Sequence, residues 1–170
     1  MVSPVELPRL VEGPDVSRVS RKDEARVLAF CGSPEVHSIC LASCGSQPDP
    51  RKAFFGSGAA AGDIVLIATS PDGDFTGFAG VRRRETASGD TGELTLRLRA
   101  GHHRDDTTVA LLRAAARDAR AAGLRRLETQ LCREAGHTLE EFQRAGLHAL
   151  STLNLGGVTE VTLGIDPSDS

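Results

Sequence analysis

The sequence contains no tryptophan and no tyrosine, and its aromatic residues are all phenylalanine. Without tyrosine, no phenol is available to donate a proton or to anchor a ligand. No apolar run approaches the roughly 20 residues that a membrane-spanning helix needs. Residues 1–16 lack a basic start followed by an apolar stretch and contain three prolines, so they do not predict a secretory signal. We therefore expect a cytoplasmic protein with no membrane partner.

The chain also lacks an excess of positively charged residues. Lysine and arginine number 20 and aspartate and glutamate 23, so the formal net charge is −3. Such a chain has no overall field that attracts nucleic acid, and we expect no nucleic-acid partner. Its 170 residues, 39% of them hydrophobic, are enough for one ordinary domain. We expect that domain to span 1–165 and residues 166–170 to form a disordered tail.

The four cysteines match no common zinc motif. Cys31, Cys40 and Cys44 lie near His37, and these residue types can bind zinc, but their spacing is unusual. Small buried thiols are frequent in protein cores. The sequence therefore favours core thiols and no metal, with Cys40 and Cys44 on one face of a helix.

Capping residues, glycine stops and hydrophobic periodicity predict the elements. Helices are expected over 20–30, over 33–44 after the pair Ser33-Pro34, over 107–122 with Thr107 or Thr108 as its cap, and from a capping box at Thr138–Glu141 to Gly146. Strands are expected over 63–69, 75–81, 93–99, 124–132, 149–155 and 158–165. Residues 46–62, rich in glycine, serine, proline and alanine, predict a long flexible loop.

The strand at 93–99, the helix at 107–122 and the strand at 124–132 follow one another through short connections. This order predicts a βαβ unit with two parallel strands at the centre of the fold. The remaining strands are joined by short turns, which favour antiparallel pairing. We therefore expect an α/β (α+β) fold with a mixed, mostly antiparallel sheet flanked by helices.

The same order of elements resembles the GCN5-related N-acetyltransferase (GNAT) family. The local resemblance is carried by residues 93–98, 110–123, 124–128 and 141–147. It implies an acyltransferase-like protein whose acyl-CoA pyrophosphate lies on a glycine-rich loop at the start of the helix at 107–122. It also implies a cleft between the strands at 93–99 and 124–132.

The loop departs from the family's pattern. Asp106 and Thr108 stand at the positions of its glycines, and Asp105 adds a second carboxylate. Side chains crowd the approach of a phosphate there, and negative charge opposes it. Phe142 stands where many members have a tyrosine that protonates the departing thiolate. We therefore expect no cofactor; if acyl-CoA still binds, Arg104, Thr107 and Thr108 would contact it.

Candidate substrate-binding residues come from the polar faces of the two strands that flank the cleft. They are Arg97, Arg99, Glu128, Gln130 and Cys132. Arg97 and Arg99 are two residues apart and could clamp an anionic group. The alternative is that these side chains form the exposed polar face of a half-buried strand.

Candidate catalytic residues are the titratable groups nearest to that cleft. They are Glu93, His102, His103, Asp105 and Asp106. A histidine beside a carboxylate can act as a general base. Helix capping is the alternative for the two aspartates, since acidic residues are common at helix starts.

Three functions remain open at this point. The first is a GNAT-like protein that has lost acyl-CoA binding and serves small-molecule biosynthetic chemistry, alone or as a subunit of a heteromeric enzyme. The second is a divergent acyl-CoA-dependent N-acyltransferase acting on a small amine. The third is a noncatalytic module that pairs through a sheet edge or the terminal hairpin. A homo- or hetero-oligomer is expected.

Overall fold

The computed structural model describes residues 14–41, 63–84, 88–100, 106–131 and 135–165. Its elements in chain order are β1 (Asp15–Arg18), a short 3-10 helix (Arg21–Asp23), α1 (Glu24–Cys31), β2 (Val36–Leu41), β3 (Ile64–Thr69), β4 (Phe75–Arg83), β5 (Thr91–Arg99), α2 (Thr107–Ala121), β6 (Arg126–Leu131), α3 (Ala135–Arg144), β7 (Leu147–Asn154) and β8 (Thr159–Ile165). The flexible loop expected at 46–62 and the tail expected at 166–170 lie outside these described residues.

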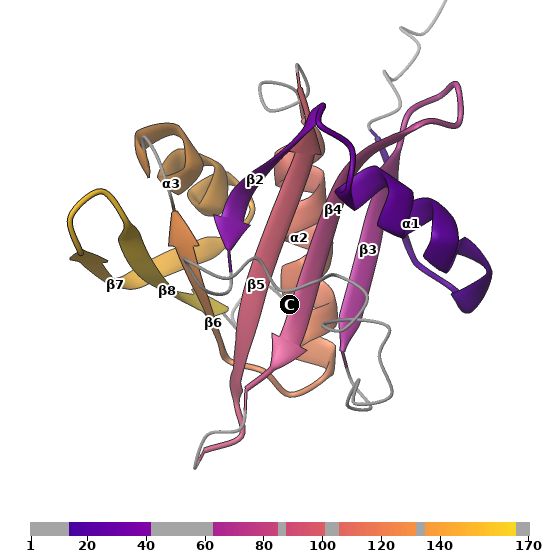
Figure 1. Ribbon diagram of the computed structural model, residues 1–170. Helices are drawn as coiled ribbons and strands as arrows, with labels where there is room; N and C mark the ends of the chain where they lie inside the picture. The colour runs from indigo at the N-terminus through magenta and orange to yellow at the C-terminus, as the bar shows by residue number, and fades with distance from the viewer. Residues whose placement is uncertain (1–13, 42–62, 85–87, 101–105, 132–134, 166–170) are drawn as a thin grey trace, which may run out of the picture.

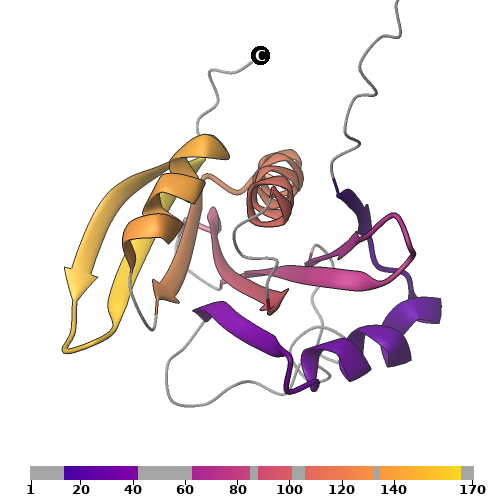
Figure 2. The same cartoon turned by 90° about the horizontal axis from the view of Figure 1, so that it is seen from above.

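The eight strands form one sheet in the order β1-β3-β4-β5-β2-β6-β8-β7. Every pairing is antiparallel except that of β5 with β6, which is parallel. Helices α2 and α3 cover one face of the sheet, and α1 lies against the other (Figures 1 and 2). The expected α/β fold with a mostly antiparallel sheet and a central βαβ unit is confirmed.

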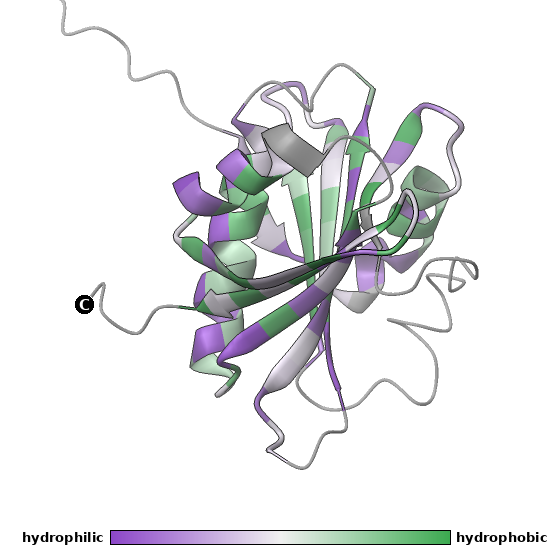
Figure 3. Ribbon diagram, turned by 90° about the vertical axis from the view of Figure 1, so that its left-hand side faces the viewer, coloured by the Kyte–Doolittle hydropathy of each residue, from purple (hydrophilic) through white to green (hydrophobic). Residues whose placement is uncertain are grey.

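The main core lies between the sheet and α2. Leu94, Leu96 and Leu98 alternate along β5 and are at most 1% exposed. They belong to the same hydrophobic cluster as Leu111 and Leu112 of α2. Hydrophilic and hydrophobic residues both occur along the helices (Figure 3), as expected for helices with one buried side. Gly123 follows α2 with φ of 85°, the left-handed conformation that the predicted helix stop requires.

The helix predicted over 33–44 is wrong for residues 33–41, and residues 42–44 lie outside the described residues. Ser33 and Pro34 begin only a single turn, in which the Val36 N–H donates to the Ser33 carbonyl at 3.1 Å. The chain then enters β2, which pairs with both β5 and β6. Two strand partners outweigh a local helix signal, because helix propensity is a weak preference that tertiary pairing overrides. Cys40 therefore lies on a strand rather than on a helix shared with Cys44.

One predicted helix start and one predicted helix cap are also wrong. Helix α3 begins at Ala135, so Thr138 lies inside the helix and does not cap it. Asp106 precedes α2, and Thr107 and Thr108 lie buried in its first turn. Strand β1 carries no pattern that the sequence analysis recognised. Among the described residues, no helix is long and apolar enough to cross a membrane.

Candidate functional site

Strands β5 and β6 run side by side only over their first three residues. Thr91, Gly92 and Glu93 lie opposite Arg126, Leu127 and Glu128. One residue further on, the Thr129 hydroxyl donates a hydrogen bond to the Leu94 carbonyl at 2.9 Å. This side chain, which is 3% exposed, joins the two strands at the point where direct pairing stops. A gap in the sheet begins beyond it.

Strand β2 fills that gap. On one side Val36, His37, Ser38 and Cys40 lie opposite Arg99, Leu98, Arg97 and Leu96 of β5. On the other side Cys40 and Leu41 lie opposite Leu131 and Gln130 of β6. Figure 1 shows β2 beside β5, with β6 beyond it. The place expected to be a ligand cleft is therefore occupied by the protein's own main chain.

The structure brings Glu93 and Glu128 together on the sheet face opposite α2. They lie opposite each other across β5 and β6. The Arg84 guanidinium lies 3.8 Å from a Glu93 oxygen and binds a Glu128 oxygen more closely. All three side chains are partly exposed. Arg84, which the sequence analysis missed, holds the two carboxylates as one cluster that small molecules can reach.

Gln130 lies next along the same face of β6. Its side-chain amide donates to Glu160 of β8 at 3.0 Å. Gln130 and Glu160 also lie opposite each other in the strand register. Together with Glu93, Arg84 and Glu128, they extend a polar strip from β5 across to β8.

Arg97 and Arg99 lie under α1 and differ from the expected anion clamp. Arg97 is 7% exposed, its Nη1 donates to the Cys31 carbonyl at 3.1 Å, and its buried Nε has no hydrogen-bond partner. Arg99 donates through Nε to the Phe75 carbonyl at 3.1 Å. Its Nη1 lies 3.6 Å from the Glu35 carboxylate. The two guanidinium groups thus bind separate protein groups.

The start of α2 presents few side-chain groups that could contact a ligand. Asp106 is exposed, makes no side-chain cap, and lies 3.4 Å from Arg144 at the end of α3. Thr107 and Thr108 are 2% and 0% exposed, and the Thr108 hydroxyl has no hydrogen-bond partner. The other candidates of this region, His102, His103, Arg104, Asp105 and Cys132, lie outside the described residues.

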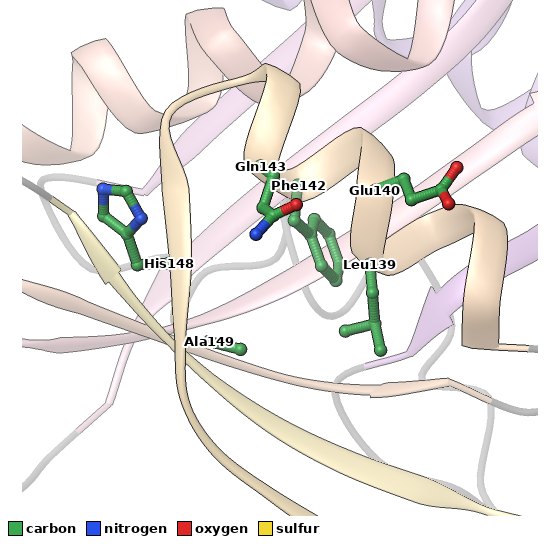
Figure 4. Close-up of a pocket in the computed structure, with 6 residues that line it drawn as sticks. All are labelled: Leu139, Glu140, Phe142, Gln143, His148 and Ala149. Atoms are coloured by element: carbon green, nitrogen blue, oxygen red, sulfur yellow. The ribbon is translucent and has the colours of Figure 1, made fainter.

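A cavity lies between α3 and β7 (Figure 4). Its volume is about 360 Å³, and its lining residues are Leu139, Glu140, Phe142, Gln143, His148 and Ala149. Phe142 is 1% exposed, so this ring contributes mainly to the core. No sequence pattern pointed to the cavity, because it depends on how a helix and a distant strand pack.

The Cys31 thiol is 6% exposed and lies in the smaller core cluster between α1 and the sheet, as expected of a core thiol. Burial raises its pKa to about 11, although the nearby Arg97 cation opposes the shift. His37 lies on β2 with its side chain exposed. Within the described ranges, no three histidine, cysteine, aspartate or glutamate side chains come together as metal ligands.

No protein-family model matches the chain, and no curated protein sequence matches it. Solved structures do resemble it. An acetyltransferase of the GNAT family from Streptococcus pneumoniae aligns with a TM-score of 0.66 at 17% identity, over 89% of this chain and 97% of that one. An N-acetyltransferase from Staphylococcus aureus aligns with a TM-score of 0.66 at 16% identity, over 91% and 99% of the two chains.

A third similar structure is that of Salmonella typhimurium yncA with its cofactor acetyl-CoA. It aligns with a TM-score of 0.66 at 16% identity, over 93% of this chain and 97% of that one. At these identities the likeness establishes the fold alone. The chain has the GNAT fold.

Proposed function

We propose that this GNAT-fold protein does not bind acyl-CoA in the manner of the family and instead serves small-molecule chemistry on the open face of its sheet. The carrying observation is β2, which pairs with β5 from Val36 to Cys40 and then with β6. The C-terminal half of β5 is thus paired on both edges, with β4 on one side and β2 on the other. An extended ligand would have to displace β2 to reach this main chain.

The residues expected to hold acyl-CoA also fit it poorly. Thr107 and Thr108 are buried, so neither hydroxyl is presented to solvent. Asp106 places a negative charge at the start of α2, where a pyrophosphate would be repelled. Arg144 already lies beside that carboxylate at 3.4 Å. We therefore route no chemical step through acyl-CoA.

The reactive group of the proposed site is the cluster of Glu93, Glu128 and Arg84. Two carboxylates that share one arginine can bind a cationic amine if the guanidinium swings away. A carboxylate released in this way can also accept a proton from an amine or a hydroxyl. Because Arg84 is half exposed, its movement costs little burial. The proposed ligand is thus a small amine, rather than the anion that the arginine pair suggested.

Two solved neighbours are consistent with that ligand class. One is described as a spermidine N-acetyltransferase chimera from Vibrio cholerae and a second source, and another as AAC(6')-Ib in complex with paromomycin and acetyl-CoA. The first name includes spermidine, and the second includes paromomycin. In our proposal, this chain works in the cytoplasm, alone or as a subunit of a heteromeric enzyme.

The second candidate function is acyl transfer to a small amine. It is favoured by the neighbour solved with acetyl-CoA, which covers nearly the same length. It requires β2 to leave β5 and β6. Isothermal titration with acetyl-CoA and longer acyl-CoAs separates the two candidates. We expect no heat of binding up to millimolar ligand, whereas micromolar affinity would favour acyl transfer.

The amine site is tested by a thermal-shift screen of polyamines and aminosugars. We expect at least one of these compounds to stabilise the wild type. Its apparent affinity should be at least about tenfold weaker for Glu128→Gln, because one carboxylate loses its charge. Glu140→Gln, which alters an exposed carboxylate on α3, serves as the control and should bind like the wild type. Equal loss in both variants, or no hit at all, would contradict an amine site at Glu128.

A further inference from the structure

Helix α2 carries a row of arginines on the side that faces away from the sheet. Arg113, Arg117 and Arg120 are exposed, whereas the helix side chains that face the sheet are buried. Spacings of four and three residues place the three arginines along one helix face. Figure 2 shows α2 between α3 and β1, and no other described element covers its outer side. We call these three residues the α2 ridge.

Two further arginines flank the α2 ridge. The Arg18 Nε on β1 lies 3.0 Å from the Asp118 carboxylate of α2. On the other side, the Arg113 Nη2 donates to the Arg144 carbonyl at the end of α3, at 3.2 Å. The Arg18 and Arg144 side chains are 59% and 62% exposed. A positively charged surface therefore extends from β1 across α2 to α3.

Few carboxylates contact this surface. Asp118 is 16% exposed and is shared, because Arg18 donates to its Oδ2 at 3.0 Å and Arg117 to its Oδ1 at 3.2 Å. Asp106 lies 3.4 Å from Arg144. Within the described ranges, no carboxylate forms an ion pair with Arg113. This local excess of arginine stands out in a chain whose formal net charge is −3.

The stability of α2 does not explain the whole ridge. Arg120 lies in the last turn of α2, where a positive charge interacts favourably with the helix dipole. Arg113 and Arg117 lie earlier in the helix, and like charges four residues apart destabilise a helix. A partner that supplies carboxylates to this face would relieve the repulsion.

We propose that the α2 ridge, together with Arg18 and Arg144, docks an acidic segment of another protein. Guanidinium groups bind carboxylates through charge-assisted hydrogen bonds of defined geometry. The protein already holds one carboxylate on this face in that way, because each oxygen of Asp118 accepts from a different arginine. Carboxylates spaced three and four residues apart on a helix would match the spacing of the ridge.

The surface fits other polyanions less well. Proteins that bind single-stranded nucleic acid stack bases on exposed aromatic rings, but the four described phenylalanines, Phe30, Phe75, Phe78 and Phe142, are buried. A helix that lies in a membrane surface inserts its apolar side, but that side of α2 belongs to the main core. The proposed amine site lies on the opposite face of the sheet, so the docking surface does not depend on it.

Fluorescence anisotropy of a labelled polyglutamate peptide, titrated with the full chain, tests the proposal. We expect saturable binding at low ionic strength that weakens as salt is added, because exposed charges are screened. Arg113→Gln/Arg117→Gln should bind at least about tenfold more weakly, since two charge-assisted contacts are lost. The matched control, Lys22→Gln/Arg125→Gln, removes two exposed positive charges outside the ridge and should bind like the wild type.

Circular dichroism establishes that each variant is folded. Should Arg113→Gln/Arg117→Gln fail to fold, Arg117→Gln alone changes a side chain that is 72% exposed, and it should bind at least about threefold more weakly.

Absence of polyglutamate binding at low ionic strength would overturn the proposal. Equal weakening in the ridge variant and its matched control would overturn it too, because attraction would then not depend on this face. Tighter binding of a single-stranded oligonucleotide of the same charge, or of phosphatidylserine vesicles, would overturn the assignment of an acidic protein segment as the partner.

Discussion

Ser38 of β2 lies directly opposite Arg97 of β5, in the part of the sheet where β5 and β6 have already diverged. The same stretch of β5 is paired on its other edge with β4, where Phe78 lies opposite Arg97. A segment that the sequence analysis expected to be a helix is thus the strand that completes the sheet. The position of Ser38 links the fold to the proposed loss of acyl-CoA binding.

Replacing Ser38 with proline should lower the free energy of unfolding by about 1–3 kcal/mol. Proline removes a main-chain donor and fits poorly within a strand that pairs with β5 along this stretch. Ser38→Ala keeps the main chain unchanged and is the control. Urea unfolding curves measure the difference, and equal stability of the two variants would contradict the position of β2.

The buried thiol of Cys31 should make stability fall as pH rises above about 9. Its pKa is about 11 in the folded protein, against an ordinary value of 9.0. Between these values the unfolded chain loses the proton while the folded chain keeps it, so the unfolded state is favoured. The expected loss is up to about 2–3 kcal/mol and levels off above the folded pKa.

The chain has no tyrosine, two lysines and three other cysteines, so few other side chains contribute to the pH dependence over this range. Cys31→Ala removes the thiol, and its stability should change less between pH 8 and pH 10.5. The assay is urea unfolding of both proteins across that range. Parallel pH profiles would show that Cys31 is not the source.

Gly77 on β4 is a place where α2 comes close to the sheet. A Cβ atom there would lie 2.6 Å from Leu111 Cδ1 and 3.0 Å from Leu98 Cδ2. Gly77→Ala should therefore destabilise the protein by about 1–3 kcal/mol, as overpacking of a core does. Ser17→Ala, on an exposed edge, should change stability little. Thermal unfolding of both variants is the measurement, and a Gly77→Ala protein as stable as the wild type would contradict the packing.

Arg97 should be dispensable for folding. Its guanidinium is buried, its Nη1 makes one hydrogen bond to the Cys31 carbonyl, its Nε has no partner, and within the described ranges no carboxylate forms an ion pair with it. Arg97→Met fills similar space without burying a charge, so we expect stability to rise by about 1 kcal/mol. A loss of stability in Arg97→Met, measured by urea unfolding, would show that the charge is compensated in the folded protein.

The regular elements were the predictable part of the fold. Alternating Leu94, Leu96 and Leu98 and the alanine-rich α2 carry strong periodic signals, and the structure confirms both elements. The pattern around Ser33 and Pro34 was locally helical, but β2 exists because β5 and β6 offer it two partners. Such long-range pairing leaves no local signal in a single sequence.

The candidate site was predictable only in part. The alternation of side chains along a strand predicts that Arg97 and Arg99 lie on one side of β5. This alternation does not show that α1 covers that side. Glu93 and Glu128 were both candidates, and the parallel register brings them opposite each other. Arg84, which joins them, follows β4 and reaches the cluster through the antiparallel pairing of β4 with β5. A contact between three separate segments cannot be read from spacing.

Hydrogen exchange of the full chain with and without acetyl-CoA tests the central claim most directly. The peptide that spans Val36–Leu41 should be protected in the free protein, because β2 pairs with β5 from Val36 to Cys40 and with β6 at Cys40 and Leu41. Its protection should not change when millimolar acetyl-CoA is added, and neither should that of residues 96–99. Loss of protection in β2 together with retained protection in β5 on addition of acetyl-CoA would show that the ligand takes the place of β2, and would contradict the account.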